Sequence, residues 1–159
     1  MWLPDETFKS VIQHTPLISI DLIVRNQQNE VLLGKRINAP AKDYWFVPGG
    51  RVRKNETLDD AFVRLVREEL GIESGVTRAD AKFLGVFEHF YDDCAFGADV
   101  STHYIVLTYI IEINQKIEIL KLRQHNEFTL LKINELKERK DVHFFVKKYF
   151  ENTFGKYND

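Results

Sequence analysis

The chain has 159 residues, of which 44% are hydrophobic, and its formal net charge is −2. This length suits one well-packed domain, residues 1–159, and is short for two, while the weak negative charge gives no support for nucleic-acid binding. The single cysteine, Cys94, excludes an internal disulfide. No apolar run approaches the roughly 20 residues that cross a bilayer, and no signal-peptide pattern is present. We therefore expect a cytoplasmic protein with neither a membrane nor a nucleic-acid partner.

Residues 1–16 predict a short helix. Asp5 can cap its N-terminus, apolar residues such as Phe8 repeat along one face, and Pro16 ends it. Trp2 precedes the helix and can tuck into the core, lie at a dimer contact or stack on a base. Packing into the core is the favoured interpretation.

The segment Leu17–Arg25 is rich in β-branched residues and predicts a strand, followed by a polar turn at 26–29 and a second strand, Val31–Arg36. Together they predict a hairpin. Asp21 lies among aliphatic residues in the first strand, an unusual place for an acid. It needs a cationic neighbour or a substrate hydroxyl, unless it is an edge-strand acid that faces water.

A short strand at Tyr44–Val47 is expected before Gly49 and Gly50, where the lack of a side chain lets the backbone approach a ligand closely. The surrounding segment is rich in cations. From Gly34 to Lys54 the one acid is Asp43, and the cations are Lys35, Arg36, Lys42, Arg51, Arg53 and Lys54. That excess of positive charge suits a phosphorylated small molecule.

The segment Leu58–Leu70 predicts a helix, with Thr57 as N-cap and Gly71 at the C-terminal end. Its apolar residues form one stripe, and Glu69 falls inside that stripe. A carboxylate in an apolar face costs several kcal/mol unless it is paired, hydrogen-bonded or bound to a metal. We therefore expect a cationic partner for Glu69.

The rest of the chain alternates between strands and helices. Long strands are expected at Lys82–Tyr91 and His103–Ile113, with a polar loop between them, and a further strand at Glu127–Leu131. A short helical turn at Ile133–Glu138 and an amphipathic terminal helix at Val142–Phe154 follow. Strands on either side of a central helix predict an α/β protein whose mixed sheet is covered on both faces.

The segment 50–72 resembles the Nudix box, G-x5-E-x7-R-E-U-x-E-E-x-G-U, where U is aliphatic. Eight positions match the pattern in register: Gly50, Glu56, Arg64, Val66, Glu68, Glu69, Gly71 and Ile72. One position departs from it, because Leu65 stands where the box has the first glutamate of its R-E pair. The resemblance implies the Nudix fold, a mixed β-sheet in an α/β/α sandwich, and the departure implies a reduced metal site, with one ion.

Beyond the box, the chain resembles the GDP-mannose mannosyl hydrolase branch of that family over nearly its full length. The matching stretches are TPLISIDLIVRN, LLGKR, YWFVPGGRV, EHFYDD, THYIVL and the pair Gln124-His125. This branch also lacks the carboxylate that Leu65 replaces. The resemblance implies hydrolysis of a small-molecule nucleotide sugar, GDP-mannose, by water attack at the anomeric carbon with inversion, in a homodimer.

The resemblance also implies a metal site and a phosphate site. One Mg²⁺, or Mn²⁺ in its place, would be held by the backbone carbonyl of Gly49, the carboxylate of Glu69 and the side-chain oxygen of Gln124. These are the hard oxygen ligands that such ions prefer. Arg36 and Arg51 would take part in catalysis by gripping the phosphates, because a guanidinium offers them a planar fork of donors.

His125 would be the general base, since an imidazole is suitably poised to accept a proton from water at neutral pH; without the resemblance, a solvated loop histidine is the favoured interpretation. Asp21, also taken as catalytic, would hold the sugar hydroxyls together with His89 and Tyr104. Their alternatives are an edge-strand acid, a solvent-facing histidine and a core tyrosine. The expected nucleotide contacts are Trp2, Leu3 and Phe8, and the box residues with a structural role are Gly50, Glu56, Arg64 and Glu68.

Two other functions stay open. One is a conventional Nudix pyrophosphohydrolase that cuts between phosphorus atoms of a nucleotide sugar or a nucleoside triphosphate. Leu65 argues against it, because fewer carboxylates bind fewer metal ions to activate a water, whereas Glu68 argues for it. The other is a non-catalytic Nudix domain that binds a nucleotide.

Overall fold

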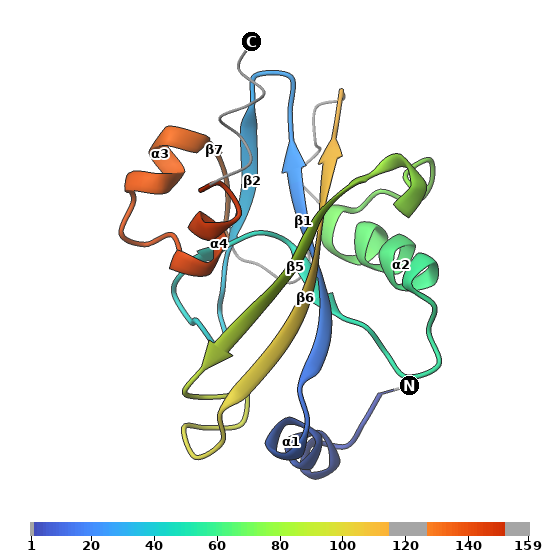
Figure 1. Cartoon of the computed structure of the whole chain (residues 1–159), viewed down its shortest axis with the longest axis vertical. Helices are drawn as coiled ribbons and strands as arrows, with labels where there is room; N and C mark the ends of the chain where they lie inside the picture. Colours follow the sequence, from blue (N-terminus) through green and yellow to red (C-terminus); the bar gives the residue numbers. More distant parts are fainter. Residues whose placement is uncertain (1, 115–126, 152–159) are drawn as a thin grey trace.

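The computed structural model describes residues 2–114 and 127–151, which form a curved sheet with helices packed around it (Figure 1). The helices are α1 (Asp5–His14), α2 (Leu58–Leu70), the 3₁₀ turn η1 (Arg78–Asp80), α3 (Ile133–Glu138) and α4 (Phe144–Lys148). The strands are β1 (Leu17–Arg25), β2 (Glu30–Lys35), β3 (Trp45–Phe46), β4 (Gly49–Arg51), β5 (Lys82–Tyr91), β6 (Thr102–Glu112) and β7 (Phe128–Lys132). Most predicted elements are confirmed to within one or two residues.

Strand β1 is the centre of the sheet. The strand order is β3-β2-β1-β6-β5, while β4 also pairs with β1 and β7 with β2. The pairing of β1 with β6 is parallel, from Leu17 opposite Tyr104 to Arg25 opposite Glu112, and the other pairings are antiparallel. Because β1 is covered on both faces, its residues are apolar almost without a break. The predicted mixed sheet and the predicted hairpin of β1 and β2 are confirmed.

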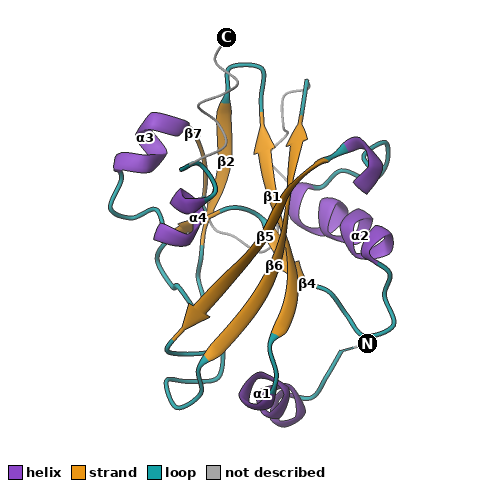
Figure 2. Ribbon diagram, viewed as in Figure 1, coloured by secondary structure: helices purple, strands orange, loops and turns teal. Residues whose placement is uncertain are grey.

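Helices cover both faces of the sheet, with α2 on one side and α3 and α4 on the other (Figures 1 and 2). Alternate residues of β1 point to opposite faces. Ile20 and Leu22 join the apolar cluster beneath α2, whereas Ile23 joins the cluster beneath α4. Asp21 shares the face of Ile23, so its carboxylate points toward α4. The predicted α/β/α sandwich is confirmed.

Two details at the helix ends differ from expectation. Helix α1 has Pro4 as its N-cap, so Asp5 is the first helical residue and the prediction that it caps the helix is wrong. In the first turn its carboxylate still interacts favourably with the helix dipole. The terminal helix begins at Phe144 because the His143 side chain caps it by accepting a hydrogen bond from the Phe145 amide, 3.2 Å away.

Helix α4 is also shorter than the predicted segment. Val142 is extended and bridges Trp45, so it belongs to no helix, and α4 itself ends at Lys148 with Tyr149 as its C-cap. Residues 152–154 of the predicted helix lie outside the described residues. No helix in the described part of the chain is long and apolar enough to cross a membrane.

The contact between β1 and β4 requires glycine at position 49, which lies opposite Asp21. A β-carbon at Gly49 would lie 2.4 Å from the carbonyl oxygen of Ile20 and 2.7 Å from Oδ1 of Asp21. At Gly50 the obstacle is Cδ2 of Leu65, 2.6 Å away. The first clash involves backbone atoms and cannot be relieved by rotating a side chain, whereas the second can.

We therefore predict that Gly49→Ala destabilises the protein more than Gly50→Ala. Overpacking typically costs about 1–3 kcal/mol; we expect Gly49→Ala at the upper end of that range and Gly50→Ala at the lower end. Urea denaturation of the two variants and the parent measures the difference in unfolding free energy. Equal denaturation midpoints for the two variants would contradict this account of the β1–β4 contact.

Candidate active site

A pocket of ≈ 170 Å³ lies where β1, β4, β5 and β6 meet the loop after β2. It brings together residues that the sequence analysis selected from five separate stretches: Asp21, Arg36, Gly49, Gly50, Arg51, His89 and Tyr104. Its lining also includes Ser19, Asn38, Phe46 and Tyr91, which that analysis missed. Of these, Tyr91 carried a usable signal, because it lies two residues after His89 and so shares its face of a strand.

Other candidate residues lie elsewhere. Trp2 is 85% exposed, so the favoured interpretation that it packs into the core is wrong for this structure. Leu3 is not part of the pocket lining, and Phe8 meets the site indirectly, through the guanidinium of Arg51. Gln124 and His125 lie outside the described residues.

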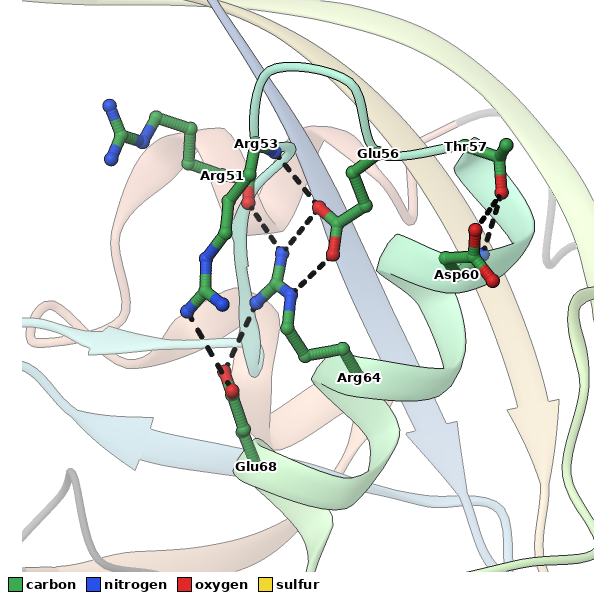
Figure 3. A network of polar contacts seen from close by, with 7 residues as sticks. All are labelled: Arg51, Arg53, Glu56, Thr57, Asp60, Arg64 and Glu68. Atoms are coloured by element: carbon green, nitrogen blue, oxygen red, sulfur yellow. Dashed lines mark hydrogen bonds and ion pairs between the residues drawn. The ribbon is translucent and has the colours of Figure 1, made fainter. Parts of the chain in front are cut away.

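The box segment is held together by the guanidinium of Arg64 (Figure 3). Nε and Nη2 donate to the two carboxylate oxygens of Glu56 over 2.6 and 2.9 Å, and Nη1 donates to Glu68 over 3.0 Å. Nη2 also donates to the backbone carbonyl of Arg51 over 2.9 Å. Glu56 in turn accepts from the Arg53 amide, 2.9 Å away. One side chain therefore ties the loop after β4 to helix α2.

These contacts set the charge state of Glu56. The hydrogen bonds from Arg64 hold its pKa down to about 2, from an ordinary value of 4.5. Glu68 is engaged as well, since it also lies 3.7 Å from a guanidinium nitrogen of Arg53. Both carboxylates thus already have cationic partners within the protein.

Arg36 and Arg51 differ from Arg64, because neither forms an ion pair with a residue that the structure describes. Arg36 donates through Nε to the carbonyl of Pro40 over 2.7 Å. The Arg51 guanidinium lies 3.9 Å from the ring centre of Phe8, and Figure 3 shows its side chain pointing away from the Arg64 network. Burial lowers the pKa of Arg51 from its ordinary value. Two cations therefore line the pocket with donors left for an anionic ligand.

Two buried carboxylates form no ion pair with a described residue: Asp21, which lines the pocket, and Glu69, which is not part of its lining. Asp21 is 8% exposed and Glu69 is 6% exposed. Burial raises the pKa of Asp21 to about 6; burial, helped by the neighbouring charge of Glu68, raises the pKa of Glu69 to about 7. In the described part of the chain Glu69 forms no ion pair, so the expected contact with a cation is not seen there; the charges of Arg36 and Arg64 act on it from a longer distance and oppose the rise of its pKa.

The hydrogen-bond partner of Asp21 in the structure is neither a cationic side chain nor a substrate hydroxyl, the two that the sequence suggested. It lies on the central strand, so the alternative of an edge-strand acid facing water is wrong. Its Oδ2 accepts a hydrogen bond of 2.5 Å from the hydroxyl of Tyr149, which the sequence analysis missed. The alternative of a solvent-facing His89 is also wrong, because that side chain is 4% exposed and lies 3.1 Å from the same hydroxyl.

Comparison with known proteins identifies the family. A family model described as the NUDIX domain matches residues 15–152. The chain belongs to the Nudix family. Over 149 residues it is 36% identical to the low-salt glycan biosynthesis protein Agl8 of Haloferax volcanii, covering 94% of this chain and 89% of that protein. It is 32% identical over 98 residues to an ADP-ribose pyrophosphatase of Methanocaldococcus jannaschii, covering 62% of this chain and 52% of that enzyme.

Solved structures agree on the fold. The MutT protein of Methanosarcina mazei Go1 superposes on this Nudix chain with a TM-score of 0.71 at 20% identity, covering 92% of this chain and 99% of that one. The NUDIX domain of Shewanella oneidensis NrtR, determined with ADP ribose, gives a TM-score of 0.62 at 14% identity, covering 93% and 97%. At these identities the likeness establishes the Nudix fold. Nudix hydrolases generally use divalent metal ions such as Mg²⁺ or Mn²⁺.

The Arg64 network predicts a particular dependence of stability on pH. Because the pKa of Glu56 falls from 4.5 to about 2 on folding, its contribution is fully present above pH 4.5 and is lost as the pH falls toward 2. In Arg64→Lys the single ammonium cannot reach all of the acceptors. We predict that R64K lowers the unfolding free energy at pH 7 by about 2 kcal/mol and loses less stability than the parent between pH 6 and pH 3.

Urea denaturation at pH 7, 6 and 3 measures both effects. Arg67→Lys is the matched control, since Arg67 is an exposed arginine on the same helix. It should behave as the parent does. If R64K lost as much unfolding free energy as the parent between pH 6 and pH 3, Arg64 would not be what sets the charge state of Glu56.

Proposed function

We propose that this Nudix protein hydrolyses GDP-mannose, or a closely related GDP-sugar, to GDP and the free hexose in a Mg²⁺-dependent reaction. Water would attack the anomeric carbon with inversion. The observation that carries the proposal is a pocket lined by two arginines that form no ion pair with a described residue, next to a box that offers few carboxylates for metal ions. The 36% identity to a protein named for glycan biosynthesis supports a role in sugar chemistry.

Leu65 supports attack at carbon over attack at phosphorus. It is 2% exposed and belongs to the apolar cluster beneath α2, with no polar atom to offer a metal. Glu68 is held by Arg64 and Arg53. That leaves Glu69 as the box carboxylate without a cationic partner among the described residues. Activation of water at phosphorus commonly uses two metal ions, and one carboxylate favours a single ion.

The arginines suit the departure of GDP. Breaking the bond between the sugar and the β-phosphate accumulates negative charge on that phosphate, while the sugar gains positive charge. Arg36 and Arg51 would bind the phosphates and stabilise the first charge. Asp21, His89 and Tyr104, which also line the pocket, would hold the sugar by its hydroxyls. His125 would accept a proton from the attacking water, a role that rests on the resemblance to the branch.

The residues present fit a divalent cation. A buried carboxylate without a partner, Glu69, is costly and is stabilised by a bound cation. Glu69, the carbonyl of Gly49 and the side chain of Gln124 would hold Mg²⁺, which would neutralise charge on the departing diphosphate. Following the same resemblance, we propose one domain over residues 1–159, a cytoplasmic location and a homodimer in which Trp2, Leu3 and Phe8 contact the nucleotide.

A conventional pyrophosphohydrolase is the second candidate. Glu68 is retained at its box position, and one relative is an ADP-ribose pyrophosphatase. This activity would require Glu68 to leave two arginines for a second metal ion. A nucleotide-binding domain without catalysis is the third candidate.

We predict that hydrolysis of GDP-mannose with Mg²⁺ in ¹⁸O-labelled water yields labelled mannose and unlabelled GDP. Attack at carbon transfers the label to the sugar, whereas attack at phosphorus leaves it on a phosphate. Mass spectrometry of the products separates the candidates. Labelled GMP or mannose 1-phosphate would identify a pyrophosphohydrolase, and an absence of products would favour another substrate or the binding domain.

A second prediction concerns the metal and needs no substrate. At pH 8, above the raised pKa of Glu69, Mg²⁺ at a hundred times its Kd should raise Tm by about 5–10 °C, because a ligand that binds the folded state stabilises it. Glu69→Gln should lose most of that shift. Glu73→Gln, at an exposed position just after the helix, should keep it. An unchanged shift in E69Q would remove Glu69 from the metal site.

A further inference from the structure

Below the pocket, three buried side chains meet from three distant parts of the chain. The Tyr149 hydroxyl, at the end of α4, lies 2.5 Å from Oδ2 of Asp21 on β1 and 3.1 Å from Nε2 of His89 on β5. Tyr149 itself is 0% exposed. The hydroxyl therefore connects two residues of the pocket while remaining outside its lining.

The protons in this contact can be assigned by counting donors. Burial raises the pKa of Tyr149 well above its ordinary value, so the phenol keeps its one proton. The short distance to a carboxylate oxygen, which can only accept, directs that proton to Asp21. The phenol oxygen is then free to accept, and His89 donates to it from Nε2, because an unprotonated Nε2 would place its lone pair against the lone pairs of that oxygen. His89 is thus the neutral Nε2–H tautomer, in agreement with burial lowering its pKa to about 3.

This assignment has two consequences for the pocket. Because Oδ2 of Asp21 is occupied, Oδ1 is the oxygen that remains beside Gly49, at the pocket lining. The His89 ring is fixed as well. It stacks on Phe145 at 4.4 Å with an interplanar angle of 6°, and its Nδ1 lies 3.5 Å from the Tyr91 hydroxyl. Both groups present one defined face to a ligand.

We propose that Tyr149 is a positioning residue, whose hydroxyl orients the Asp21 carboxylate and selects the tautomer of His89 so that both are set for the sugar end of the substrate. The effect on kcat rests on the proposed function, whereas the tautomer of His89 does not. The ring and the hydroxyl have separable tasks, since the ring packs edge-on against Phe87 at 4.7 Å. Tyr149→Phe keeps the packing and removes the hydroxyl alone.

Tyr109→Phe is the matched control. Tyr109 is also buried, and its hydroxyl accepts a hydrogen bond of 3.2 Å from Arg78, on the opposite face of the sheet beneath α2. Y149F removes two hydrogen bonds, to Asp21 and to His89, and Y109F removes one. We predict a fall in Tm for both variants, larger in Y149F, but a fall in kcat of about 10- to 100-fold in Y149F alone, the range expected when reacting groups are misplaced.

Kinetics on GDP-mannose and binding of GDP together test the positioning role. In Y149F the Kd of GDP should stay within twofold of the parent value, because the phosphates are bound by Arg36 and Arg51. The proposal would be overturned if kcat in Y149F equalled that of the parent, or if Y109F lost as much kcat as Y149F. It would also be overturned if a weaker affinity for GDP accounted for the whole loss of activity in Y149F.

The tautomer is tested separately by NMR of protein with ¹⁵N-labelled histidine, with the His89 signal assigned by its loss in His89→Gln. The parent should show an Nε2–H signal for His89 that exchanges slowly with solvent and that changes in Y149F but not in Y109F. An Nδ1–H tautomer in the parent, or an unchanged signal in Y149F, would refute the assignment. If the parent fails to hydrolyse GDP-mannose, the proposed function fails while this spectrum still decides the role of Tyr149.

Discussion

The Arg64 guanidinium is the contact on which the site depends. The loop after β4 has a turn hydrogen bond of its own, from the Glu56 amide to the Arg53 carbonyl. Arg64 ties this loop and the end of β4 to helix α2, because it donates to Glu56 and to the Arg51 carbonyl. Fixing that carbonyl fixes the backbone of Arg51, whose side chain points away from the Arg64 network in Figure 3 and lines the pocket. A residue on the helix therefore positions a cation 13 positions earlier in the chain without touching the pocket itself.

The pocket region combines charges that the protein leaves uncompensated. Among the described residues, Arg36 and Arg51 form no ion pair, and neither do the buried carboxylates Asp21 and Glu69. Holding a charged side chain without an ion pair costs free energy in the unliganded protein. Proteins retain such side chains at functional sites, where a bound ligand compensates the cost. A ligand with phosphates for the arginines, together with a divalent cation for Glu69, would meet both needs. A diphosphate with its bound metal is such a ligand.

Local patterns were sufficient to predict the elements and the box. The helix Leu58–Leu70 followed from its stripe and its caps, and the structure has Thr57 accepting from the Asp60 amide and Gly71 in the left-handed conformation. The environment of Asp21 could not be predicted in this way. Its partner Tyr149 is 128 residues away, and only the three-dimensional arrangement of β1 and α4 brings the two together. The same long-range packing explains why an apparent edge acid proved central.

Leu65 links the packing of the core to the number of carboxylates in the box. Its side chain lies against the backbone of Gly50, so the volume that a box glutamate would use is filled by a methyl group. A glutamate there would lie one helical turn before Glu69, in an apolar cluster, with two carboxylates to neutralise. It would be tolerated only with a further cation. The leucine instead stabilises the core, and Glu69 is left as the box carboxylate that forms no ion pair with a described residue.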